Sequence, residues 1–207
     1  MKKALILVSV LALALGISYL VLHKNDDENG KGEGKDPALL VSSKTSAFNR
    51  SFEQVLNNYF YLLDAFVAND TVLVSKAANQ LAISVDSIRF DQLKADSSLL
   101  LTAISVARSI PSEIQGLQGE KTMEQKKREF NMITQDMYSL ILTVKYDGEI
   151  IYHMSCPTAF SDSTAGDWLS RTNEIVNPYQ AKSNLTGKSG IPDCGEIKDS
   201  LHFRSGE

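Results

Sequence analysis

Apolar residues recur at steps of three and four through most of this 207-residue chain, and this spacing constrains its fold more than any other feature. A helix with such a stripe buries it against neighbouring helices. The pattern appears in four segments, at about 48–68, 71–89, 96–110 and 121–146. Because short connections join antiparallel helices, we expect a mainly α fold built on an antiparallel four-helix bundle.

Polar caps and helix breakers set the expected helix ends. Asn69, Asp70 and Thr71 provide a turn and an N-cap before the second helix. Pro111 either kinks or ends the third helix, because proline has no backbone N–H and its ring crowds the preceding turn. We place that end at Ile110. The charge run at 124–129 is typical of a solvated helix face.

The first residues are typical of an export signal. Lys2 and Lys3 precede an apolar run over residues 4–22. This run is longer than an ordinary signal-peptide core and close to the roughly 20 residues that span a bilayer. Two alternatives stay open for residues 1–22: a cleaved signal peptide, or a membrane anchor that keeps this segment in contact with the membrane. In both, we expect an exported protein, either periplasmic or anchored in the inner membrane and facing the periplasm.

Composition divides the rest of the chain. Residues 23–44 are rich in Asn, Asp, Glu, Gly and Lys, and predict a flexible tether. Residues 45–207 are then one helical domain, with a C-terminal cap at 149–203. The net charge of −4 and the absence of a basic stripe argue against nucleic acid as a partner.

The cap carries a different pattern. Turn-forming residues are dense from Pro157 onward, which predicts an irregular cap rather than another helix. Residues 149–155 predict one short strand. Alternation along it would place Met154 and Cys156 together on one face and His153 on the other face. Four further residues are expected to hold the cap in place, because Trp and Tyr bury an apolar body and keep a polar group: Trp168, Asn177, Pro178 and Tyr179.

The two cysteines, Cys156 and Cys194, have three open interpretations. In an exported protein they can form a disulfide, closing a loop of about 38 residues and stabilising the fold by about 3–4 kcal/mol. Thiolates also prefer soft ions such as Cu(I), with Met154 and His153 as further metal ligands. Zinc is disfavoured, because it takes four ligands and thioethers bind it poorly. The third interpretation is a pair of free thiols.

Four short blocks carry a resemblance to a known family. They read Tyr-x-x-x-Cys-Pro-x-Ala-Phe, Trp-Leu-Ser, Ile-x-Asn-Pro-Tyr and Cys-Gly-Glu-Ile, and lie at 152–160, 168–170, 175–179 and 194–197. In these blocks the chain resembles the uncharacterised bacterial domain-of-unknown-function family 3347. The resemblance implies a domain that follows an export signal or is appended to a periplasmic adaptor of a copper or silver efflux system. It therefore suggests Cu(I) as a ligand and a heavy-metal efflux component, or another envelope protein, as a partner.

The chain also departs from the family pattern. Thr158 stands where the family usually has methionine after Cys-Pro, and residues 180–193 contain no methionine. Two thioether ligands are thus missing, and Met154 and His153 are the nearby residues that could replace them.

Enzyme signatures are absent from the sequence, which has no Gly-x-Ser-x-Gly, His-Glu-x-x-His, phosphate-binding loop or Cys-x-x-Cys. We expect no enzyme and no catalytic residues. Two hypotheses remain: a non-catalytic cell-envelope domain that binds or relays a soft metal, and a module that binds a protein or a small ligand and uses its cysteines only as a disulfide.

Overall fold

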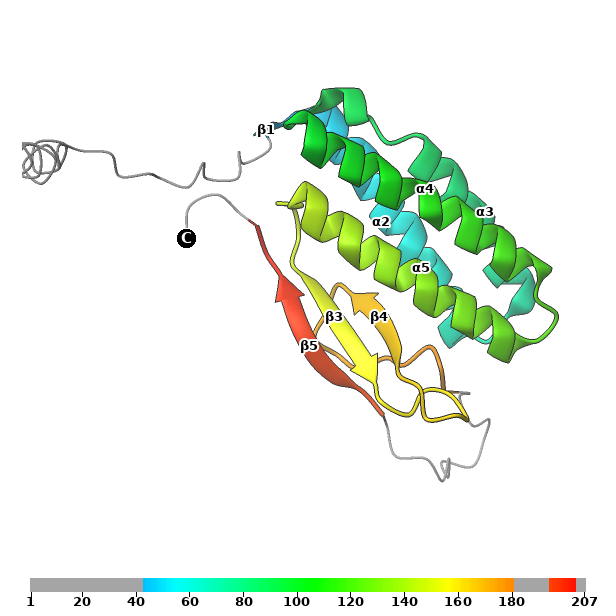
Figure 1. The fold of residues 1–207 in the computed structure, drawn as a ribbon. Coiled ribbons are helices and arrows are strands. Elements are labelled where there is room, and N and C mark those ends of the chain that lie inside the picture. The colour runs from blue at the N-terminus through cyan, green and yellow to red at the C-terminus, as the bar shows by residue number, and fades with distance from the viewer. Residues whose placement is uncertain (1–42, 181–193, 204–207) are drawn as a thin grey trace, which may run out of the picture. The chain divides into compact units, whose positions relative to one another are not determined.

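Four helices lie side by side and account for most of the described chain (Figure 1). The computed structural model describes residues 43–180 and 194–203, all within one compact unit at 40–207. The helices are α2 (Ser46–Val67), α3 (Thr71–Asp86), α4 (Ser97–Gly119) and α5 (Met123–Val144). The predicted helical bundle is confirmed.

Each helix begins where a side chain caps free backbone N–H groups. Such caps replace hydrogen bonds that the first turn of a helix cannot make within itself. Asp70 accepts hydrogen bonds from two backbone N–H groups at the start of α3, and Asp96 accepts one at the start of α4. Thr45 caps α2, and Thr122 forms a reciprocal capping box with Gln125 at the start of α5.

The predicted end of the third helix at Ile110 is wrong, because α4 continues through Pro111 to Gly119. Proline inside a helix removes one hydrogen bond and costs about 3 kcal/mol. The next two turns offset this cost by burying Ile114 and Leu117, which are 3% and 0% exposed. Tertiary packing therefore outweighs the local preference at Pro111.

The core of the bundle is aromatic where α2 faces α5. The rings of Phe66 and Phe130 lie 4.6 Å apart, and those of Tyr59 and Phe130 lie 5.6 Å apart. Ring pairs at these separations stabilise a core beyond their buried area alone. The start of α2 is also held by a short pairing of β1 (Ser43–Lys44) with β2 (Leu93–Lys94).

The cap contains a three-stranded antiparallel sheet, where one short strand was expected. Its strands are β3 (Ile151–Cys156), β4 (Gly166–Ser170) and β5 (Glu196–Leu201), in the order β4-β3-β5, beside α5 (Figure 1). The sequences of β4 and β5 carry charges and lack clean alternation, so neither predicts a strand by itself. They become strands because β3 offers a partner edge on each side.

The pairing register fixes what each face of the sheet carries. Directly opposite residues share a face, so Met154 lies with Trp168, and Cys156 lies with Gly166. The other face carries His153 and the neighbouring pair formed by Ser155 and Asp167. A β-bulge interrupts the pairing of β3 with β5 after His153.

The helices protect the outer edge of β4. The N–H of Leu169 donates to the hydroxyl of Tyr59 at 3.0 Å, and the N–H of Asp167 donates to Oδ1 of Asn131 at 2.7 Å. The backbone N–H groups of these two alternate residues point away from β3. Side chains from α2 and α5 therefore pair N–H groups that would otherwise lie unpaired at the edge of the sheet. Tyr59 also shares a 2.8 Å hydrogen bond with Thr134, and both residues are fully buried.

None of the helices in 43–180 and 194–203 is long and apolar enough to cross a membrane. The predicted signal or anchor at 1–22 lies outside the described residues. So does the predicted tether at 23–44, apart from the two residues of β1.

Tyr59→Phe should lower the free energy of unfolding by about 1–3 kcal/mol, since it leaves the buried N–H of Leu169 without its acceptor. Tyr61→Phe, a change at a partly buried position in the same helix, is the matched control. Urea unfolding followed by circular dichroism measures both. Equal stability of the two variants would show that the Tyr59 hydroxyl does not hold the sheet against the helices.

Candidate functional site

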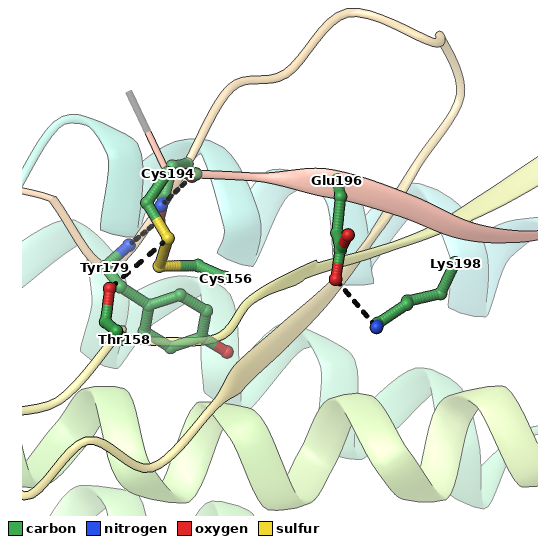
Figure 2. Close-up of a disulfide and its surroundings, with 7 residues drawn as sticks. Cys156, Thr158, Tyr179, Cys194, Glu196 and Lys198 are labelled. Carbon is green, nitrogen blue, oxygen red and sulfur yellow. Dashed lines mark hydrogen bonds and ion pairs between the residues drawn. A yellow bond between two sulfur atoms is a disulfide. The ribbon is translucent and has the colours of Figure 1, made fainter. Parts of the chain in front are cut away.

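A disulfide joins Cys156, at the end of β3, to Cys194, just before β5. The sulfurs are 2.15 Å apart, and Figure 2 shows the bond beside Thr158 and Tyr179. The predicted disulfide is confirmed. It suggests an oxidising environment of the kind that exported proteins meet.

The remaining candidate metal ligands do not gather around these sulfurs. Met154 is fully buried opposite Trp168, on the same face of the sheet as Cys156. His153 lies on the other face, where its ring is 4.4 Å from that of Tyr138. No group of three or more His, Cys, Asp or Glu side chains in the described part of the chain is placed to hold a metal ion. The oxidised cap therefore does not fit a Cu(I) site, because both thiolates are taken up by the disulfide.

The residues expected to hold the cap form a connected set. Trp168 is fully buried, Tyr179 is 7% exposed, and their rings lie 6.2 Å apart. Asn177 donates to the carbonyl of Cys194 at 2.6 Å and accepts from the N–H of Tyr179 at 2.8 Å. The hydroxyl of Tyr179 donates to the carbonyl of Asp167. Pro178, which lies between Asn177 and Tyr179 in the sequence, is buried. The Asn177 side chain thus bridges Tyr179 and Cys194 by two hydrogen bonds.

A polar cluster lies on the face of the sheet that meets α5. His153 Nε2 is 3.7 Å from Oδ2 of Asp167, and Tyr138 donates to Asp199 at 3.1 Å. The approach of His153 lowers the pKa of Asp167 and outweighs the burial that raises it, and a hydrogen bond from Ser155 acts in the same direction as His153. Sequence reasoning missed this cluster, because its members are close only after the sheet has packed on the helix.

A pocket of about 440 Å³ lies next to the disulfide. Its walls come from the turn between α2 and α3, the first turns of α5, the loop at 158–161 and Tyr179. Thr158 belongs to this wall and places its hydroxyl 3.6 Å from the sulfur of Cys194. The disulfide therefore contacts the wall of the pocket through Thr158.

Two lysines of the supposedly solvated run at 124–129 are buried, which corrects that interpretation. Lys126 is 6% exposed and donates to the carbonyl of Leu117 at 2.7 Å. Lys127 is 7% exposed, donates to the carbonyl of Tyr179 at 2.9 Å, and lines the pocket. Burial lowers the pKa of Lys127. The local pattern at 124–129 could not indicate this burial, because the Tyr179 carbonyl is 52 residues away along the chain.

These observations define a class of protein: a four-helix domain with a disulfide-bonded β cap and a pocket between them. A family described as protein of unknown function (DUF3347) matches residues 55–147, and this match confirms the predicted resemblance over that part of the chain. The match begins within α2, runs to just after α5, and ends before the motif blocks at 152–197 that first indicated the family. No curated protein and no solved structure matches the chain.

Asp167→Asn should destabilise the protein at neutral pH, and the difference from wild type should shrink in acid. A carboxyl whose pKa is lowered by folding stabilises the fold above its unfolded value, near 3.8, and that stabilisation is lost as pH falls through the lower folded value. Urea unfolding at a series of pH values from 7 to 3 measures the effect. Asp64→Asn, an exposed change on α2, is the control. A difference that stays constant over this range would contradict the assignment.

Proposed function

We propose that this protein is a non-catalytic binding domain of the cell envelope, exported and facing the periplasm, which takes a small ligand in the pocket beside its disulfide. The main observation in support is that Thr158 lines the pocket and also contacts the sulfur of Cys194. In this proposal the cysteines hold the binding site together and do not themselves bind the ligand.

The contacts of the disulfide support this role. Cys156 directly precedes the loop that supplies Thr158 and Phe160 to the pocket. Cys194 is linked through Asn177 to Tyr179, which forms another part of the wall. Both ends of the disulfide thus restrain a wall, and a site held in this way needs less ordering when a ligand binds.

A soft-metal role would need a different state of the same residues. Cu(I) binding by Cys156 and Cys194 requires that the disulfide first be reduced to two thiolates. Met154 is on the correct face of β3 to assist, whereas His153 is on the other face. Handing copper to an efflux component would depend on that reduced state, so the two functions are separable by experiment.

Reduction of the disulfide, or replacement of both cysteines by serine, should lower the free energy of unfolding by about 3–4 kcal/mol, the value expected for a loop of 38 residues. Thiol titration in denaturant should find no thiols before reduction and two after it. The double-serine variant is the control, because added reductant should leave its stability unchanged.

A Cu(I) competition on the reduced protein completes this test. The proposal expects no binding tighter than that of a weak chelator. Tight binding that is lost in the double-serine variant would support the metal function instead, and unchanged stability after reduction would count against a structural role for the disulfide.

A further inference from the structure

The pocket contains a buried positive charge that lacks a carboxylate partner. Among the ion pairs formed by the described residues, none includes Lys127. Its hydrogen bond to the carbonyl of Tyr179 uses one N–H of an ammonium that can donate three. Removing a charge from water is costly unless it is paired, so a negative ligand group beside Lys127 would be favoured.

The neighbouring charges already have partners. Arg128 lies between two carboxylates, 3.7 Å from Glu124 and 3.1 Å from Asp162. Ser161 also donates to Glu124 at 3.3 Å. Glu124 also lines the pocket, and its negative charge raises the pKa of Lys127 by less than burial lowers it. That charge is shared with Arg128. Lys127 is therefore the charge at this site that a ligand can pair with.

The rest of the lining sets the shape and polarity of a matching ligand. Met123, Ala159 and Phe160 offer apolar surface, and Thr158 and Ser161 offer hydroxyls. A volume of about 440 Å³ is in the range of small-molecule sites. A single lysine without an arginine fork suits one negative charge better than the several charges of a phosphate group.

We propose that this pocket binds a small organic carboxylate, whose charged group pairs with Lys127 while its apolar body lies against Phe160 and Met123. This inference rests on the proposed ligand site and adds the chemical class of the ligand.

The test compares two probes of nearly the same shape on the full, oxidised chain: benzoate, which is charged, and benzyl alcohol, which is neutral. Titrations followed by ¹H–¹⁵N NMR should show saturable shifts at 158–161 and Lys127 with benzoate. Benzyl alcohol should bind at least about ten-fold more weakly, because it cannot compensate the buried ammonium. Affinity for benzoate should also fall as pH rises through the pKa of Lys127.

Two variants and a matched control assign the effect to Lys127. Lys127→Met should weaken benzoate binding at least about ten-fold, whereas Lys126→Met, at an adjacent and equally buried lysine outside the pocket lining, should change it less than about two-fold. Asn69→Asp places a negative charge at the exposed rim and should weaken binding several-fold. Aspartate tolerates the positive φ of 54° at this position, so this variant also serves if Lys127→Met does not fold.

The outcomes distinguish the ligand class from the ligand site. Equal binding of both probes, or unchanged benzoate affinity in folded Lys127→Met or in Asn69→Asp, overturns the carboxylate inference and leaves the proposed site standing. If neither probe shifts the pocket residues at millimolar concentration, both the inference and the proposed ligand site fail.

Discussion

The buried hydroxyl of Tyr59 is the point on which the arrangement of the cap depends. It joins α2 to α5 through Thr134 and to β4 through the N–H of Leu169. Burial raises the pKa of this phenol well above its usual value, so it stays neutral and can serve both partners. Asn131 likewise accepts a hydrogen bond from the N–H of Asp167. Together, Tyr59 and Asn131 bind the outer edge of β4 to the helical bundle. The sheet is thereby held at a fixed place beside α5, and so is the loop at 158–161 between β3 and β4, which forms one wall of the pocket.

The helices could be predicted from sequence because their apolar spacing and caps are local. Asp70 caps α3 through N–H groups two and three residues away. The end of α4 could not be predicted in the same way, because Pro111 is a local breaker whose cost is offset by the distant packing of Ile114 and Leu117. The strands β4 and β5 were missed for a related reason, since their pairing partner lies elsewhere in the chain.

The residues of the candidate site could likewise be predicted only in part. The cysteines and the cap residues were identifiable by type, yet the sequence left disulfide, metal and free thiols open. The two cysteines are 38 residues apart in sequence, and only the folded chain brings their Cα atoms within 5.2 Å and joins their sulfurs. Lys126 and Lys127 looked like ordinary surface charges. Their burial depends on carbonyls of Leu117 and Tyr179, which are 9 and 52 residues away along the chain. Nothing in the local pattern could indicate these partners.

The two edges of the sheet are anchored by different means, and this difference bears on function. β4 is fixed to α2 and α5 by uncharged hydrogen bonds that redox conditions do not alter. β5 is almost wholly exposed before Leu201 and is held by its pairing with β3, by Tyr138 and by the disulfide. Loss of the disulfide would therefore loosen the cap from the side of β5 and the Thr158 wall, while the aromatic core between α2 and α5 would keep its own contacts. Ligand binding should depend on the oxidised cap more strongly than the helical fold does.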